Sequence, residues 1–238
     1  LAAAFEVVSA AAPGELEVSL VLPSQLGRHA TATIYVEYAN IGEVSMTAPV
    51  LMVFASDRAF LTLDQERVSS GFWTSAIPEG FSDTIAILAS GETPGLIHPG
   101  ESKTIPVYYA GLQQPWDMQD NGIAFSTTTY YEDDEKFIDW DVQDLSIKPA
   151  YMEEAVWDEI KDVFHAEVGN TWGSYVSALA QDAYALYTMG RSVTDVAKLF
   201  SYQLYQTMGY LELPQTKNLN DLASAGAGVP LSMVRSYQ

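Results

Sequence analysis

The chain has 238 residues, with 11 basic against 31 acidic residues and a formal net charge of -20. It contains no cysteine, and 48% of its residues are hydrophobic. These values exclude a disordered chain, a disulfide scaffold and a thiolate metal site. They also argue against a nucleic-acid binder, which needs clustered Lys and Arg. The length suits one large domain or two modest ones, and no apolar window of about 20 residues predicts a membrane span.

The first part of the chain, residues 1–148, shows apolar residues alternating with polar ones at period two. Turn signals such as Asn40-Ile41-Gly42 and Pro99-Gly100 separate the alternating runs. About seven short strands with this punctuation predict an antiparallel β-sandwich of the immunoglobulin type. The predicted strands cover residues 15–22, 30–39, 50–55, 84–89, 103–109, 122–131 and 142–147.

After Pro149 the apolar period changes to three and four, which predicts helices over residues 151–168, 171–189 and 193–208. A glycine follows each helix, at positions 169, 190 and 209, and is the expected C-terminal stop. Ser192 is the expected N-cap of the third helix. The fold class is therefore α+β, with a sandwich in residues 1–148, a three-helix segment in 149–211, and a loop and strand in 212–238. The apolar stripe predicted for the first helix consists of Met152, Val156, Ile160, Val163 and Phe164.

The two ends of the chain suggest a segment of something longer. The chain begins with Leu1, without an intact secretory signal, and residues 214–228 look like a loop before a last strand at 229–237. A strand in that position needs a partner edge, which a neighbouring sheet would supply by strand addition. The alternate positions expected to set the register of this assembly strand are Val229, Leu231, Met233, Arg235 and Tyr237.

Three stretches carry a resemblance to known families. The strand at residues 32–39, followed by Asn40-Ile41-Gly42, resembles bacterial cell-adhesion-related immunoglobulin-like modules, as does Pro99-Gly100-Glu101-Ser102 before a strand. The segment Gly228-Val229-Pro230-Leu231, followed by Arg235 and Tyr237, is similar to the opening strand of RHS or YD-repeat proteins. These resemblances imply a large secreted or surface-displayed bacterial protein, in which other modules or neighbouring subunits are the partners.

A run of acidic residues between positions 132 and 144 offers a candidate calcium site. Asp133 and Asp134 are expected in a turn, and Asp139 and Asp141 on one face of the next strand. Calcium takes six to eight oxygen ligands, many of them carboxylates on loops. The run lacks the EF-hand pattern. The alternative is a solvated acidic loop that keeps a sheet edge from aggregating.

Aromatic residues offer a second candidate site. Trp73 and Trp116 fall near predicted loops, where exposed rings could stack on sugars, or where they could simply cover the ends of the sandwich. The helices also hold more tyrosines than one buried stripe accommodates, which predicts either burial on two sides or an interface.

The function that these features favour is a non-enzymatic structural or adhesive module, extracellular or at the cell surface, with Ca²⁺ as its possible ion. The alternative is a carbohydrate-binding module. A hydrolase using paired carboxylates is a third hypothesis, for which no acid and base stand out.

Overall fold

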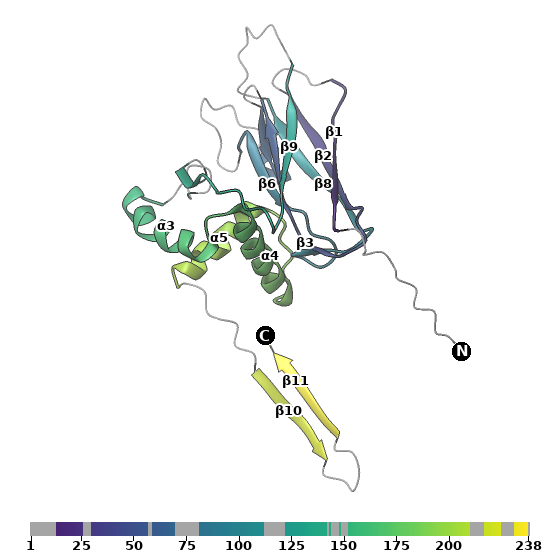
Figure 1. Cartoon of the computed structure of the whole chain (residues 1–238), viewed down its shortest axis with the longest axis vertical. Coiled ribbons are helices and arrows are strands. Elements are labelled where there is room, and N and C mark those ends of the chain that lie inside the picture. Colours follow the sequence, from purple (N-terminus) through teal and green to yellow (C-terminus); the bar gives the residue numbers. More distant parts are fainter. Residues whose placement is uncertain are drawn as a thin grey trace, which may run out of the picture.

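A computed structural model of the chain describes residues 13–25, 30–56, 59–69, 81–111, 122–141, 143, 148, 152–209, 217–224 and 231–237. It confirms the α+β class, with antiparallel sheets and helices (Figure 1). The strands are β1 (Leu16–Val21), β2 (Thr31–Asn40), β3 (Met46–Thr47), β4 (Val50–Ala55), β5 (Phe60–Thr62), β6 (Thr84–Leu88), β7 (Leu96–Ile97), β8 (Ser102–Ala110), β9 (Phe125–Tyr130), β10 (Lys217–Ser224) and β11 (Leu231–Tyr237). The helices are α1 (Gln65–Ser69), α3 (Glu154–Val168), α4 (Trp172–Thr188) and α5 (Val196–Thr207).

Two antiparallel sheets share one hydrophobic core. The first has the strand order β1-β2-β8-β5 and the second the order β6-β4-β9. Alternate residues of β2, Ile34 and Val36, belong to the same buried cluster as Leu51 and Val53 of β4. This is the period-two pattern that predicts β2 from the sequence, because successive side chains of a strand point to opposite faces.

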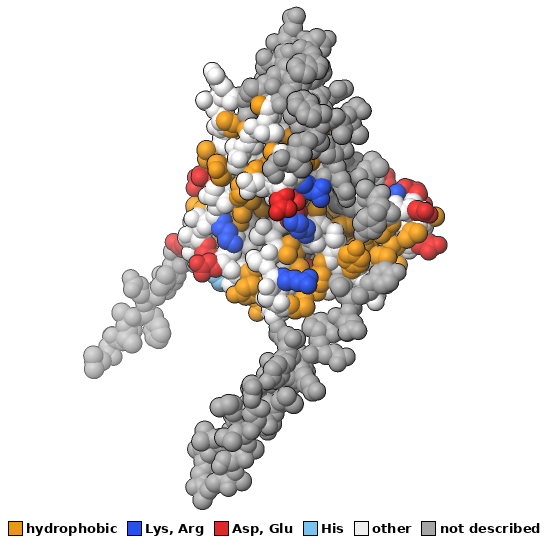
Figure 2. Space-filling model, turned by 180° about the vertical axis from the view of Figure 1, so that it is seen from behind, with side chains coloured by type: hydrophobic (Ala, Val, Ile, Leu, Met, Phe, Trp, Pro, Cys, Tyr) orange, Lys and Arg blue, Asp and Glu red, His pale blue; other side chains and the backbone are white. Residues whose placement is uncertain are grey.

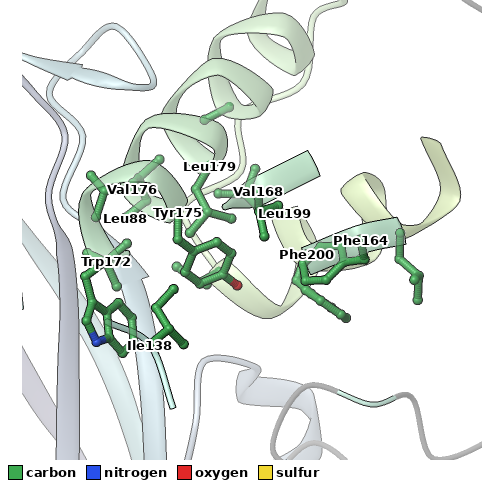
Figure 3. Packing of buried hydrophobic residues seen from close by; sticks show 14 of the residues in the cluster. Leu88, Ile138, Phe164, Val168, Trp172, Tyr175, Val176, Leu179, Leu199 and Phe200 are labelled. Atoms are coloured by element: carbon green, nitrogen blue, oxygen red, sulfur yellow. The ribbon is translucent and has the colours of Figure 1, made fainter. Parts of the chain in front are cut away.

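Strand β4 is buried on both of its faces. Leu51 and Val53 belong to the core between the sheets, whereas Val50 and Met52 belong to a second cluster formed with α3, α4 and α5. The helices therefore pack against the outer face of the β6-β4-β9 sheet, mainly at the end where Val50, Leu88 and Tyr130 lie side by side (Figures 1 and 3). Burial on both faces explains why the β4 sequence is apolar without interruption rather than alternating.

The three long helices begin and end at local signals. Thr171 caps α4 in a capping box with Ser174, each side chain accepting from the other's backbone N–H. The predicted stops Gly169, Gly190 and Gly209 all have positive φ, at 83°, 79° and 71°. Positive φ favours glycine because it carries no Cβ.

The structure confirms part of the buried face predicted for α3 and corrects the rest: Met152 and Phe164 are buried and Ile160 is partly buried, as predicted. Trp157, Phe164 and Val168 are buried there, while Val156 and Val163 are 42% and 49% exposed. Residues 157, 160, 164 and 168 lie on one face at helical spacing, so the buried face keeps Ile160 and Phe164 but includes Trp157 and Val168 in place of Val156 and Val163. Burying a Trp removes more apolar surface from water than burying a Val, so the helix turns its tryptophan inward.

The start of α5 is also corrected. Asp195, not Ser192, is the N-cap, and its carboxylate accepts a hydrogen bond from Ala197 N at 3.0 Å. The preceding backbone pairs with the edge of the sheet instead of entering the helix. Leu88 N of β6 donates to Thr194 O at 2.8 Å, and Asp195 forms a β-bridge with Ile87. This pairing covers the open edge of β6.

The predicted strand at 142–147 is wrong where the structure describes it. Asp141 and Gln143 are helical, and Gln143 N donates to Asp139 O at 3.0 Å. Residues 142 and 144–147 lie outside the described part of the chain. A short helical turn here brings Trp140 against α3, with its ring stacked on His165 at 4.2 Å between centroids.

The predicted C-terminal strand is confirmed over its described residues, but it has a partner within the chain. β11 pairs antiparallel with β10, which occupies part of the stretch predicted to be a loop. The β10 sequence is rich in Asn and Asp, residues depleted in strands, so cross-strand pairing overrides its local preference. Among the described helices, none is both long and apolar enough to cross a membrane.

Candidate functional site

The Asn-Ile-Gly motif is a structural element rather than a reactive one. The fully buried Asn40 accepts hydrogen bonds from Glu15 N and Gly42 N, and it donates to Val44 O and Ile97 O. These four bonds tie together β1, the turn after β2, and β7. A Cβ at Gly42 would lie 2.1 Å from Pro13 O, so no side chain fits there.

Helix α4 comes unusually close to the β-strands that it covers. A Cβ at Gly95 would lie 2.3 Å from Ala180 O, and a Cβ at Gly173 would lie 2.4 Å from Glu132 O. Gly173 N also donates to Asp134 O at 2.9 Å. The two glycines let the helix backbone approach the strand connections more closely than any other residue would allow.

A pocket of about 330 Å³ opens beside this contact. Helix α4 contributes one face of it, with residues at positions i, i+3, i+4 and i+7, while β3, the start of β7 and the residue two after β9 supply the rest. The volume lies near the lower end of the range for small-ligand sites, about 300–1,000 Å³. The lining residues are Thr47, Gly95, Leu96, Glu132, Ser177, Ala180, Gln181 and Tyr184.

Glu132 is the charged group of this pocket, and it belongs to the acidic run that the sequence marks out. Its Oε2 accepts a hydrogen bond from the Thr47 hydroxyl. Tyr184 lies at the surface, with 51% of it exposed. The pocket thus combines a carboxylate, hydroxyls, an amide and an accessible aromatic ring.

The four aspartates predicted as calcium ligands do not come together as a ligand group. Asp133, Asp139 and Asp141 are exposed, and Asp134 is half-buried. Within the described ranges, no three His, Cys, Asp or Glu side chains are placed to hold a metal ion. The predicted strand that was to align Asp139 and Asp141 is a helical turn, which removes the face they would share.

A second polar group lies inside the helix layer. Asp182 of α4 is 8% exposed, and the Gln203 side-chain amide of α5 donates to its Oδ1 at 3.2 Å. Burial, and then the negative charge of Glu167 on α3, raise the pKa of Asp182 from 3.8 to about 7. Burial and the charge of Asp182 raise the pKa of Tyr175, whose buried hydroxyl has no hydrogen-bond partner in the described part of the chain. Helical spacing is the signal in the sequence that could have marked Asp182, because it lies three residues after Leu179 and four before Leu186, on the buried face of α4.

The remaining predicted site residues lie either outside the described part of the chain or on β11. Trp73 and Trp116 lie outside the described residues, and so does Val229. The remaining assembly positions fall on β11, where each has a cross-strand partner on β10: Leu231 with Ser224, Met233 with Leu222, Arg235 with Leu219, and Tyr237 with Lys217.

The tyrosines of the helices divide between core and surface. Tyr175 is buried, whereas Tyr184, Tyr187 and Tyr205 are 51%, 47% and 41% exposed. The helices therefore bury one side against the sheet and leave these rings outside. On the face seen in Figure 2, hydrophobic side chains are interspersed with acidic and basic ones.

No family model and no curated protein matches the chain. Among solved structures, the chain is similar to AvmM, whose structure is described by the words "AvmM Catalyzes Macrocyclization in Alchivemycin A Biosynthesis". The two are 15% identical over 49% of this chain and 73% of that one, with a TM-score of 0.30. A likeness at this level carries no argument about fold or activity.

Proposed function

We propose that this protein is a non-enzymatic structural or adhesive module of a large bacterial surface or secreted protein, joined to its neighbours by strand addition. The observation that supports this is the β10–β11 hairpin, which forms a two-stranded sheet by itself. An antiparallel pair leaves half of the N–H and C=O groups of each strand unpaired. The hairpin therefore offers two edges, of 8 and 7 residues, for a further strand.

The energetics of short sheets favour a third strand. A two-stranded hairpin alone is marginally stable in water, and further strands or a packed face are needed for independent stability. A bulge between Asn220 and Leu222 places Leu219 and Leu222 opposite Arg235 and Met233. Most of the apolar residues thus fall on one series of cross-strand pairs, namely Leu219, Leu222, Leu231, Met233 and Tyr237, whereas Val234 and Ala223 fall on the other.

We interpret the two sheets of the body as an immunoglobulin-like sandwich, with the three-helix segment as a layer on its outer face. The shared core between two antiparallel sheets supports this interpretation. The net charge of -20 and the absence of cysteine agree with an extracellular or cell-surface location, because secreted bacterial surface proteins are often acidic and cysteine-free, although an acidic cytosolic protein has the same composition.

Light scattering over a range of concentrations tests strand addition between copies of the chain. The mass should rise with concentration. Proline has no backbone N–H, and neighbouring residues of a strand direct their N–H groups to opposite edges. Of the two variants Met233→Pro and Val234→Pro, one therefore removes a donor from the open edge of β11, and the other removes a hydrogen bond between β11 and β10. Both variants should lower the mass, whereas Val234→Thr, which keeps its N–H, should not. A single-chain mass at every concentration would contradict addition between copies and leave a different module as the partner.

A further inference from the structure

The pocket beside α4 has the features of a binding site, and it is not part of the strand addition proposed above. Its helical face is held in place by the close approach of Gly95 to Ala180 O. Opposite, the Thr47 hydroxyl holds the carboxylate of Glu132 at Oε2, and no hydrogen bond from the described residues reaches Oε1. One carboxylate oxygen is therefore available to a ligand.

The charge around this pocket has one sign. Glu132 is followed by Asp133, Asp134 and Glu135, and none of the lining residues is Lys or Arg. The nearest cation in sequence, Lys136, has its ammonium 5.6 Å from the centre of the Tyr130 ring, which does not line the pocket. With a chain net charge of -20, the field at the pocket attracts cations and repels anions.

The remaining lining residues suit the stem of a long cationic side chain. Leu96 and Ala180 offer apolar contact, and the exposed ring of Tyr184 can take a cation or an alkyl chain against its face. The volume of about 330 Å³ suits a side chain or a small amine better than a large cofactor.

We propose that this pocket binds a single Lys or Arg side chain from a basic segment of a partner protein. The charged head pairs with Glu132, the Gln181 amide oxygen and the Ser177 hydroxyl accept further hydrogen bonds, and the stem lies along Leu96 and Tyr184. Arg and Lys carry only donors, which matches the acceptors offered here. The inference does not rest on the β10–β11 hairpin.

Calorimetric titration of the full chain with side-chain mimics tests the proposal. The cationic probes are N-acetyl-arginine amide and N-acetyl-lysine amide. Their neutral counterparts are N-acetyl-citrulline amide and N-acetyl-norleucine amide, which keep the stem and remove the charge. Methyl β-glucoside represents a neutral sugar. The cationic probes should bind at least about tenfold more tightly than the neutral ones, because a charge-assisted hydrogen bond is lost with the charge.

A matched pair of variants separates the pocket from the general acidic field. Glu132→Gln should weaken binding of the cationic probes about tenfold, whereas Glu135→Gln removes the same charge outside the pocket and should weaken it less than about twofold. Tyr184→Ala should weaken binding about threefold, with Tyr187→Ala, one turn further along α4, as its control. Should Glu132→Gln fail to fold, the tyrosine pair still tests the pocket, because both rings are about half exposed.

Several outcomes would overturn the inference. Equal binding of citrulline and arginine probes would show that charge is not recognised. Equal losses from Glu132→Gln and Glu135→Gln would assign binding to the diffuse field rather than to the pocket. Binding of the glucoside without the cations would make this a sugar site. Absence of binding at about 10 mM of either cationic probe would also contradict it.

Discussion

The ring of Tyr130, the last residue of β9, lies flat on the ring of Trp172, the first residue of α4, with 3.8 Å between centroids and 8° between planes. The pair joins the β6-β4-β9 sheet to the helix layer (Figure 3 shows Trp172 beside the other buried residues of that layer). Trp172 is only 5% exposed, and its backbone N–H donates to Lys136 O at 2.9 Å. This contact sets where α4 begins against the sheet.

The first prediction concerns that pair. Trp172→Ala should lower the free energy of unfolding by about 3–5 kcal/mol, because it removes a large buried ring and leaves a cavity. In a double-mutant cycle with Tyr130→Ala, the coupling between the rings should be about 0.5–1.5 kcal/mol. Urea denaturation followed by circular dichroism measures both quantities. Tyr187→Ala, at an exposed ring on the same helix, is the control, and an additive double mutant would show that the stacking contributes nothing.

Gly190 and Gly95 have similar backbone conformations but differ in the space available to a side chain. Gly190 and Gly95 have φ of 79° and 84°, but a Cβ at Gly190 meets nothing within 4 Å, whereas one at Gly95 meets Ala180 O. Gly190→Ala should cost about 1–2 kcal/mol from backbone strain. Gly95→Ala should cost at least about 2 kcal/mol more, because α4 must move away from β7. Equal losses of stability for the two variants in thermal denaturation would mean that α4 can move away from Gly95 at little energetic cost.

The third prediction follows from the raised pKa of Asp182. Its carboxyl is protonated in the folded state up to about pH 7, but in the unfolded state only below about 3.8, so the stability it contributes is present below pH 3.8 and lost as the pH rises to about 7. The groups facing it are Glu167 on α3, Tyr175 on α4, and Tyr202 and Gln203 on α5.

Asp182→Asn should therefore raise the free energy of unfolding above pH 7, by about 1–2 kcal/mol once solvent screening is allowed for, and have little effect near pH 4. Denaturation curves at several pH values between about 4 and 8 would measure the difference from the parent chain. The exposed Asp162→Asn is the control. A difference that stays constant with pH would show that Asp182 does not titrate in this range.

The fourth prediction concerns Asn40. Asn40→Ala leaves buried donors and acceptors of the backbone unsatisfied around the β1, β2 and β7 junction, and should cost about 2–4 kcal/mol. Asn40→Asp keeps the shape but replaces the two donor hydrogens by a buried charge, and should cost at least as much. Asn170→Ala, at an exposed position, should change stability by less than about 0.5 kcal/mol. Tolerance of Asn40→Ala would contradict the structural role of the motif.

Local signals in the sequence suffice for much of the fold. Alternation over β2 predicts a strand with one buried face, and Gly169, Gly190 and Gly209 end helices because their positive φ is a local property of the chain. The α+β class follows from where the apolar period changes. These features depend on residues within a few positions of one another, so they can be read from the amino-acid sequence by itself.

Features that depend on contacts between distant segments needed the tertiary structure. Trp157 faces the core instead of Val156 because of what packs against α3, and β10 is a strand because β11 pairs with it. The pocket brings Glu132 to Ser177, and the pKa of Asp182 depends on its burial and on the charge of Glu167 from another helix. Periodicity predicts which residues share a face, but burial and electrostatics depend on what covers that face, and only the folded chain decides this.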